Sequence, residues 1–454
     1  MAARCGGAWP AARGLWAAQA AARCRDPLLG RRFESSAAAP GALRTASPAA
    51  GRATGALPPH LQKIVDDYEK DMSDPAKTPW FLRQKAAVPV GLVVAAGFGF
   101  VIHSLDDVSS DLHRATGCLL SWLEPERARS LLLWAAMGGW LPRDYDKDDP
   151  YLVIEPQEGL RFMTPVGLAA GVDREARAPN AFLNMGFGSV EVGPVGTAAA
   201  AAAGGAVADV DEVRRQLVAR QEGEVGFAAH RQVAHIGLIG ATIAGDAAAL
   251  PGLAQALAPH VDYLALELSA LPADLLSDPE ALRQVVSEVV GAALLGGQGP
   301  KVFLRVHPGA WPEAAAPAAA RRRRAAVLSV AALTGGASGL VLCVGGGTRA
   351  PPATDIIGEV YRQSRGRLVL IACGDMAGGG VAMDWVAAGA STVQFSSALM
   401  TEGLQACRRI KNEMSQVLMH EGYVNLHDAV GASHRKKKGR RKNLWRPKGA
   451  DSSE

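Results

Sequence analysis

The chain has 454 residues, of which 48% are hydrophobic and 20% charged, and its net charge is +4 at pH 7. This length and composition suffice for one large buried core and exclude a disordered or fibrous protein. The six cysteines form no C-x-x-C motif, which excludes the usual zinc-finger spacings, and we expect no metal site. We predict reduced, mostly buried thiols rather than a disulfide framework.

Residues 1–55 are rich in Ala and Arg, with eight arginines against only Asp26 and Glu34. This basic, acid-poor composition is typical of a mitochondrial transit peptide. A disordered leader in an alanine-rich chain is the alternative. We favour the transit peptide because an apolar segment follows. Residues 56–85 would then lie on the matrix side of the membrane.

The apolar segment from Ala86 to Leu105 contains twenty residues without Asp, Glu, Lys or Arg. Twenty residues in a helix span about 30 Å, the thickness of the hydrocarbon core of a bilayer. We therefore predict one transmembrane helix over 86–105, with a buried core helix as the alternative. Arg83 and Lys85 precede it and aspartates follow it, which places the main body on the intermembrane-space side.

Residues 108–143 contain two apolar stretches, "DLHRATGCLLSWL" and "PERARSLLLWAAMGGWLPR", separated by Glu124 and Pro125. The pattern predicts a helical hairpin whose Leu and Trp side chains lie in the membrane interface. A hairpin that packs on the main domain is an alternative reading, and the two readings are compatible.

From residue 148 to residue 434, short β-rich apolar runs alternate with helical stretches. The runs are "PVGLAAG", "SVEVGPV", "VAHIGLIGA", "VDYLALEL", "KVFLRVH", "GLVLCVG", "LVLIACGD" and "STVQFSS". Eight such units predict an α/β fold, a parallel (β/α)₈ TIM barrel, with a doubly wound open sheet as the alternative. Functional residues of such a barrel lie at the carboxyl ends of its strands. Residues 435–454 are expected to form a basic, disordered tail.

Both ends of this region resemble a known family. "TPVGLAAGVDREARAPNAFLNMGFGSVEVGPV", "AAGASTVQFSSALMTEG" and "GYVNLHDAVGASHR" are similar to the first strands, the last strand and the C-terminal helix of dihydroorotate dehydrogenases. The targeting region, membrane helix and hairpin resemble class 2, the quinone-type mitochondrial branch. The resemblance implies oxidation of dihydroorotate to orotate through FMN, electron transfer to ubiquinone, and a place in the inner mitochondrial membrane.

The resemblance also implies a serine base after the fourth strand, within an "N-V-S-S-P-N" motif. The matching residues here are "ELSALP", Glu267 to Pro272, so that Ala270 occupies the base position. A methyl group cannot accept a proton, and we predict no catalytic residue at that position. If a base exists, Ser269, Glu267 and His307 are the candidates.

Family positions for substrate contacts are also changed. The asparagine after the third strand matches Leu238, and the "T-N-T" motif after the sixth strand matches Cys343, Val344 and Gly345. An alanine-rich stretch, "VGTAAAAAAGGAVADVD", replaces the segment that carries the orotate loop. These side chains offer no amide hydrogen bonds, so we expect the substrate carboxylate to lack its binding groups.

Some flavin-binding positions remain in a degenerate form. The resemblance assigns FMN contacts to Ala170, Gly171, Arg174, Arg305, Gly374, Ser396 and Ser397. Arg174 and Arg305 replace lysines, and Arg129 replaces a histidine of the hairpin. Asp375 stands where a second phosphate-binding glycine is expected, and its charge would repel a phosphate.

These observations favour a catalytically inactive, membrane-anchored barrel with a structural or assembly role and no bound cofactor. Its partners would be inner-membrane lipids and other subunits of a membrane complex, and no nucleic acid is expected. The Arg321–Arg324 run and the basic tail are candidate contact surfaces, or else solvated charge clusters. The alternative is an FMN-dependent dihydroorotate dehydrogenase (quinone) with a rewired site.

Overall fold

The computed structural model describes residues 106–110, 112–197, 207–222, 237–294, 299–308, 311, 318–344 and 352–435, and five helical residues between 62 and 70. The described residues from 106 onwards belong to one compact unit, and those between 62 and 70 to a second. The predicted leader, the 86–105 segment and residues 436–454 lie outside the described residues. Within the described ranges, no helix is both long enough and apolar enough to span a bilayer.

Eight parallel strands form a closed barrel, because the first strand pairs with both the second and the last. These strands are β3 (Val166–Leu168), β4 (Ser189–Gly196), β6 (Leu238–Ile243), β7 (Tyr263–Glu267), β8 (Lys301–Val306), β9 (Gly339–Val344), β10 (Val369–Gly374) and β11 (Thr392–Phe395). Each of the eight runs predicted from the sequence overlaps one of these strands. The predicted barrel is therefore confirmed, and the open-sheet alternative is wrong. A short strand, β5 (Ala208–Asp209), pairs with the end of β4.

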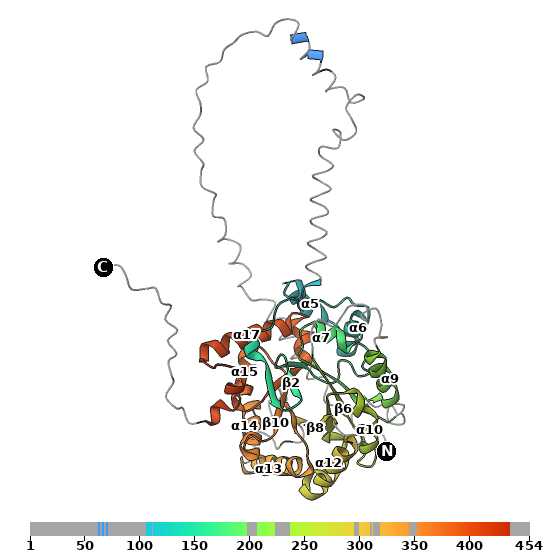
Figure 1. Ribbon diagram of the computed structural model, residues 1–454, viewed down its shortest axis with the longest axis vertical. Coiled ribbons are helices and arrows are strands. Elements are labelled where there is room, and N and C mark those ends of the chain that lie inside the picture. Colours follow the sequence, from blue (N-terminus) through green and yellow to red (C-terminus); the bar gives the residue numbers. More distant parts are fainter. Residues whose placement is uncertain are drawn as a thin grey trace, which may run out of the picture. The chain divides into compact units, whose positions relative to one another are not determined.

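Helices follow the strands and surround them, as Figure 1 shows from one end of the barrel. They are α7 (Pro179–Asn184), α9 (Val210–Gln221), α10 (Leu250–Leu257), α11 (Ala273–Ser277), α12 (Pro279–Ala293), α13 (Ala318–Gly335), α14 (Ala353–Ser364), α15 (Gly379–Ala388), α16 (Ser397–Glu402), α17 (Ala406–Glu421) and α18 (Leu426–Ala429). The buried apolar residues of these helices and of the strands form one continuous core, as the alternating pattern requires.

The register of the strands determines which side chains face the barrel interior. Directly paired residues share a face, and residues two apart on one strand point the same way. Arg305 pairs with Glu267, and Cys373 pairs with both Cys343 and Gln394. Polar and thiol side chains therefore meet inside the barrel, near the carboxyl ends of the strands.

Tyr263 fills the interior below this polar layer because its neighbour on β6 is a glycine. A Cβ atom on Gly240 would lie 2.1 Å from Cζ of the Tyr263 ring, which is too close for any side chain. The ring is fully buried and packs edge to face against Phe303, with 5.6 Å between ring centroids. The lower part of the barrel is thus a packed core.

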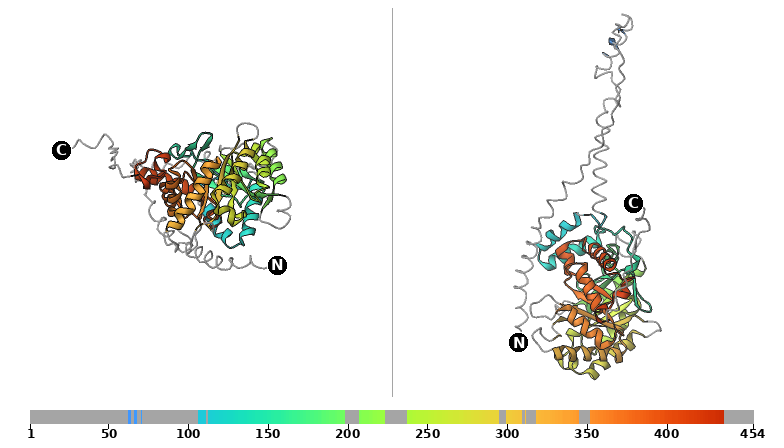
Figure 2. Two further views of the ribbon diagram at one scale, coloured as in Figure 1. Left: turned by 90° about the horizontal axis from the view of Figure 1, so that it is seen from below. Right: turned by 90° about the vertical axis from the view of Figure 1, so that its left-hand side faces the viewer.

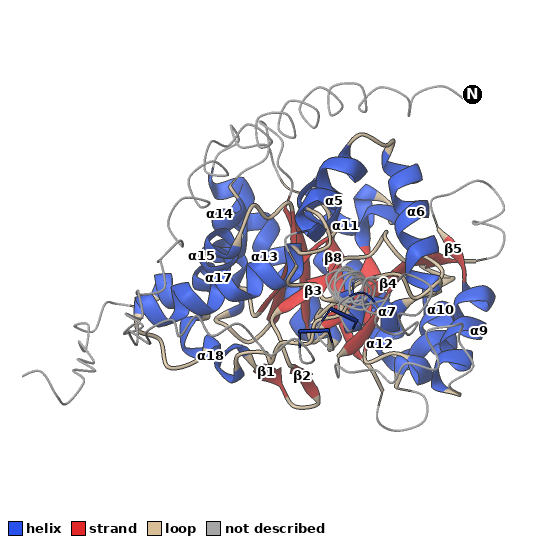
Figure 3. Ribbon diagram, turned by 90° about the horizontal axis from the view of Figure 1, so that it is seen from above, coloured by secondary structure: helices blue, strands red, loops and turns tan. Residues whose placement is uncertain are grey.

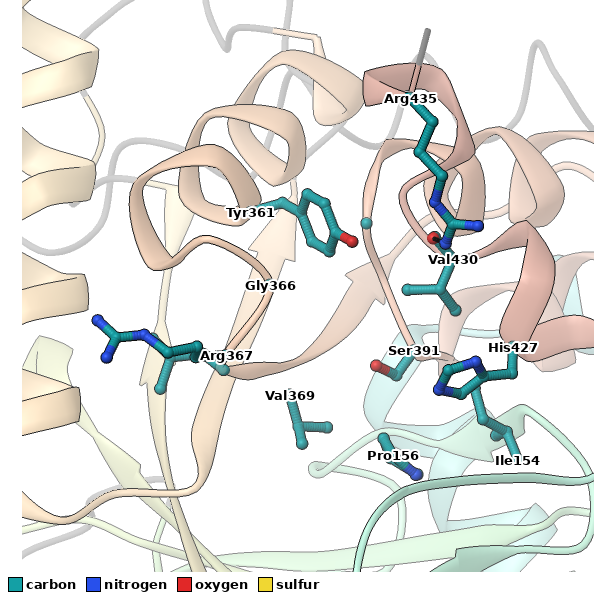
Figure 4. A pocket seen from close by; sticks show the side chains of 12 residues that line it. Ile154, Pro156, Tyr361, Gly366, Arg367, Val369, Ser391, His427, Val430 and Arg435 are labelled. Atoms are coloured by element: carbon teal, nitrogen blue, oxygen red, sulfur yellow. Dashed lines mark hydrogen bonds between the residues drawn. The ribbon is translucent and has the colours of Figure 1, made fainter. Parts of the chain in front are cut away.

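Two hairpins lie at opposite ends of the barrel (Figures 2 and 3). The predicted helical hairpin is confirmed as α5 (Leu112–Ser121) and α6 (Pro125–Met137), and it lies at the carboxyl ends of the strands. The β-hairpin of β1 (Ile154–Gln157) and β2 (Leu160–Phe162) lies at the amino ends. There it borders a small pocket of about 140 Å³, which residues such as Arg367, His427 and Arg435 line (Figure 4).

A buried ion cluster joins α17 to the segment that links the helical hairpin to the barrel. Lys411 Nζ donates to Asp144 Oδ2 at 2.6 Å and to Asp148 Oδ1 at 2.5 Å. Arg408 Nη1 adds a contact with Asp144 Oδ1 at 3.3 Å. Lys411 is 2% exposed; burial alone would lower its pKa, but the nearby Cys407, Asp144 and Asp148 raise it above its ordinary value. The cluster fixes the hairpin segment to the barrel.

Candidate active site

A network centred on Glu191 occupies the barrel interior at the level of the strand ends. Glu191 is fully buried, and one of its carboxylate oxygens accepts hydrogen bonds from Arg305 Nη1 and Thr242 Oγ1. The other oxygen accepts from Tyr263 Oη at 3.2 Å and from Gln394 Nε2 at 3.1 Å. Every donor comes from the barrel wall, so both carboxylate oxygens are satisfied within the protein.

Glu267, the last residue of β7, extends this network to the mouth of the barrel. Its Oε2 lies 3.4 Å from Arg305 Nε and 2.8 Å from His307 Nε2, and its Oε1 accepts the Ser269 hydroxyl at 2.7 Å. Burial alone would raise the pKa of Glu267, but its hydrogen bond with His307 and the nearby positive charge hold that pKa below its ordinary value. The carboxylate is therefore ionised and paired.

The predicted base position lies in a short 3₁₀ turn, Leu268–Ala270, directly after β7. Ser269 and Ala270 are both exposed, and the Ser269 hydroxyl is bound to Glu267. The His307 side chain is half-exposed, 44%, and its Nε2 also lies beside the buried Glu267 carboxylate. The structure thus brings Glu267, Ser269 and His307 together, and Ala270 contributes no polar group.

The structure corrects one predicted position. Leu238 is the first residue of β6, whereas the matched asparagine should lie near the carboxyl end of that strand. Our assignment of Leu238 is therefore wrong, and Thr242 is the inward-facing polar residue of β6 near that end. Cys343 and Val344 do end β9, as predicted, and Gly345 lies outside the described residues.

The predicted phosphate turns after β10 and β11 are bound to each other. The Ser397 hydroxyl donates a hydrogen bond to Asp375 Oδ1, so the donor expected for a phosphate already has a carboxylate partner. Gly374 has a packing role, since a Cβ atom there would lie 2.3 Å from the Val344 carbonyl oxygen. Ser396 is the residue directly before α16, and its side chain makes no capping hydrogen bond to that helix.

Arg174 and Arg129 lie at the helical hairpin and share one carboxylate. Arg174 Nη2 donates to Glu126 Oε1 at 2.8 Å, and Arg129 Nε donates to Glu126 Oε2 at 3.0 Å. Arg129 Nη1 also lies 3.4 Å from the Val172 carbonyl oxygen. These contacts tie α6 to the loop after β3, and they engage the guanidinium that the resemblance assigns to the flavin.

The loop after β3 holds the last two predicted flavin positions, Ala170 and Gly171. The Gly171 N–H donates to a carbonyl of β4 at 2.9 Å, and its φ of 107° lies in a region that favours glycine. Two residues later, Asp173 is fully buried and accepts the N–H groups of Arg177 and Ala178. Burial raises the pKa of Asp173 to about 6.

Sequence reasoning missed Glu191, Thr242, Tyr263 and Gln394. Glu191 is the one charged residue in the apolar run "SVEVGPV". A carboxylate in a buried strand requires a partner, so this residue alone indicated a polar contact inside the barrel. Its partner on β8 lies 114 positions further along the chain, so the pair could not be assigned without the barrel register.

Comparisons with known proteins agree with this architecture. The family model described as dihydroorotate dehydrogenase matches residues 324–418. The dihydroorotate dehydrogenase (quinone) of Rhodospirillum rubrum is 31% identical over 370 residues, which cover 73% of this chain and 97% of that protein. This chain belongs to the dihydroorotate dehydrogenase family.

Other members of the dihydroorotate dehydrogenase family extend the likeness. The mitochondrial dihydroorotate dehydrogenase (quinone) of Mus musculus is 28% identical over 396 residues, which cover 79% of this chain and 100% of that protein. A crystal structure of the Eimeria tenella enzyme in complex with ferulenol has a TM-score of 0.58 at 25% identity, over 69% of this chain and 96% of that one. The predicted family is confirmed.

Proposed function

We propose that this dihydroorotate dehydrogenase-like protein is catalytically inactive and serves as a structural or assembly component of a mitochondrial inner-membrane complex. The observation that carries the proposal is the closed network around Arg305, whose guanidinium binds both Glu191 and Glu267. If a substrate or flavin separated either carboxylate from Arg305, a buried charge would lose its ion-pair partner, which costs several kcal/mol.

The base position supports the same proposal. Dihydroorotate oxidation needs a group that accepts a proton from the substrate, and Ala270 has none. Glu267 also presents an ionised carboxylate where the family places an amide. An anionic product such as orotate would be repelled by it.

The residues at the flavin positions do not fit FMN. The Ser397 hydroxyl donates to the Asp375 carboxylate. A phosphate that bound this hydroxyl would have to displace the carboxylate, and it would still lie close to the carboxylate's negative charge, which repels it. Arg174 is paired with Glu126 on the helical hairpin. We therefore expect the barrel to fold without a cofactor, with its own side chains completing the interior.

The helical hairpin supports the proposed membrane association. Its large exposed apolar residues include Leu119, Trp122, Leu123, Leu131, Trp134, Met137 and Trp140. Trp122 and Trp140 are 86% and 73% exposed, and tryptophan is the residue that prefers the interface between lipid and water. We infer that this face contacts inner-membrane lipids or another subunit, with the barrel on the intermembrane-space side, and that no nucleic acid is bound.

The proposed transit peptide, the 86–105 helix and the basic tail belong to the same proposal. The Arg321–Arg324 run lies in α13, and three of its arginines contact groups on the neighbouring helices α11 and α14: Asp355, Glu359 and the Leu276 carbonyl oxygen. This geometry favours a role in packing α13 against its neighbours over a contact surface.

One observation favours the alternative, an FMN-dependent dihydroorotate dehydrogenase with a rewired site. His307 is half-exposed, and its Nε2 lies 2.8 Å from Glu267. A histidine oriented by a buried carboxylate is an effective general base. In this reading His307 would replace the serine base.

Two measurements on the purified full-length protein separate these functions. The first is flavin absorbance, and the second is dihydroorotate-dependent quinone reduction with excess FMN supplied. We expect neither flavin nor turnover. Turnover that is lost in His307→Gln would establish the rewired enzyme and overturn the proposal, whereas bound FMN without turnover would overturn only the expected absence of a cofactor.

Carbonate extraction of mitochondria tests the proposed location. We expect the protein to remain in the membrane pellet, and deletion of residues 86–105 to release it. Release of the intact protein would contradict the transmembrane assignment and favour a peripheral contact through the hairpin.

A further inference from the structure

Two cysteines lie side by side inside the barrel, at the carboxyl ends of neighbouring strands. Cys343 on β9 is the direct register partner of Cys373 on β10. Cys373 also pairs with Gln394, whose side chain reaches the interior, so both thiols face inward. Both residues are reduced in this structure and keep a small exposed fraction, 7% and 8%.

The spacing of the two strands suits a disulfide. Hydrogen-bonded strands lie about 4.8 Å apart, and the Cα atoms of disulfide-linked cysteines lie about 4.4–6.8 Å apart. Because Cys343 and Cys373 are direct register partners on the same face of the sheet, no shift of the backbone register is needed to bring their sulfurs together.

The surroundings of the two thiols are unequal. Arg305 Nη2 lies 3.8 Å from the Cys373 sulfur, and Cys343 is the direct neighbour of Cys373 on the adjacent strand. The neighbouring Cys343 thiol and the Arg305 guanidinium lower the pKa of Cys373, although burial opposes them. The neighbouring Cys373 thiol, followed by burial, raises the pKa of Cys343, although Arg305 acts in the opposite direction. A thiolate beside a cation is the reactive form of cysteine, whereas a neutral buried thiol is inert.

We propose that Cys343 and Cys373 form a reversible, peroxide-sensitive dithiol in which Cys373 is the attacking sulfur and Cys343 the resolving one. The Cys373 thiolate attacks hydrogen peroxide, the O–O bond breaks, and hydroxide leaves and takes up a proton. The resulting sulfenic acid is attacked by Cys343; an S–S bond forms, the S–O bond breaks and water leaves. Two thiols lose two electrons, and one peroxide becomes two waters.

A shared metal ion is the competing use of two neighbouring thiols. Within the described part of the chain, no group of three or more His, Cys, Asp and Glu side chains is placed to hold a metal ion. The Arg305 cation beside Cys373 also opposes binding of a second cation. The geometry therefore favours the disulfide.

The test uses the full-length protein, reduced and then treated with one equivalent of hydrogen peroxide. Free thiols are alkylated under denaturing conditions and the peptides are mapped by mass spectrometry. We expect two of the six cysteines to escape alkylation, in a linked peptide that joins Cys343 to Cys373, and dithiothreitol to restore them. Oxidation of Cys373 to a sulfinic acid without linkage, or a link between other cysteines, would overturn the proposal.

Three variants assign the roles, each checked first for a native circular dichroism spectrum. Cys343→Ser should leave a sulfenic acid on Cys373 that dimedone traps, and Cys373→Ser should abolish the reaction with peroxide. Cys407→Ala is the matched control, because Cys407 is fully buried outside the barrel interior, donates to the Gly186 carbonyl oxygen, and should leave the link unchanged. Stoichiometric zinc binding that either serine variant abolishes would assign the pair to a metal instead.

Discussion

Arg305 of β8 donates through Nη1 to Glu191 Oε1 of β4, and both side chains are buried inside the barrel. The two strands are three places apart in the barrel order, so this contact crosses the interior. Glu267 binds the same guanidinium from the strand next to β8. One cation thus holds two carboxylates, at the level where barrel enzymes bind their ligands.

Loss of Glu191 should destabilise the protein strongly. Glu191→Ala leaves the hydrogen-bond donors of Arg305, Tyr263 and Gln394 without their acceptor, and we expect the free energy of unfolding to fall by about 3–5 kcal/mol. Glu126→Ala is the matched control, because it also removes an arginine-bound glutamate, but one that is 62% exposed; its effect should stay below about 1 kcal/mol. Urea unfolding measures both. Equal losses would mean that the interior network contributes nothing beyond a surface ion pair.

The contribution of Glu267 should disappear in acid. Its folded pKa lies below the ordinary value of 4.5, so its ionised form stabilises the folded state above that pH, and this stabilisation is lost as the pH falls through the folded pKa. In urea unfolding, Glu267→Gln should be less stable than the parent protein near neutral pH, and the difference should shrink as the pH falls below 4.5 and through the folded pKa. A difference that does not change with pH would contradict the ionised, paired carboxylate.

Asp173 should show the opposite dependence. Its folded pKa of about 6 exceeds the ordinary 3.8 because of burial, so the folded state binds the proton more tightly and loses stability as the pH rises from about 4 to about 6. Asp173→Asn removes this loss. Its single amide oxygen can accept only one of the two N–H groups, which bind separate carboxylate oxygens in the parent protein, so the variant also carries a loss of stability that does not change with pH. From about pH 4 to about pH 7, the variant should gain about 2 kcal/mol relative to the parent protein. A constant difference would refute the raised pKa.

Restoring a serine at the base position should not restore activity. General base catalysis contributes about 10²–10⁴-fold, and only for a substrate that is already positioned. Ala270→Ser adds a hydroxyl to an exposed turn but leaves Glu267 and the Asp375–Ser397 pair in place. With excess FMN, we expect no dihydroorotate-dependent quinone reduction by the parent protein or the variant. Turnover by the variant alone would mean that the flavin and substrate sites are intact.

The barrel was predictable because each strand is a short apolar run and each run is followed by a helix. The parallel order and the closure follow from that alternation. Leu238 was misplaced because the run "VAHIGLIGA" begins before β6, whose own range starts at Leu238. Apolar runs predict that a strand exists more reliably than where it ends.

The candidate site was predictable by residue type but not by contact. The sequence shows that Arg174 and Arg305 keep a positive charge, yet it does not show that Glu126 and Glu191 neutralise them. Each pair joins residues distant in the chain, 48 and 114 positions apart. Such pairs depend on the barrel register and on the place of the hairpin.

The closure of the barrel sets an order of events during synthesis. β3 pairs with β11, and Asp144 binds Lys411, which lies 267 positions further along. A ribosome must therefore release nearly the whole chain before either contact forms, and β3 keeps one unpaired edge until then. Exposed strand edges attract other chains, so we expect a nascent chain that ends before Thr392 to associate with chaperones. A chain extended through α17 should escape them, as pulse-labelling and co-precipitation would reveal.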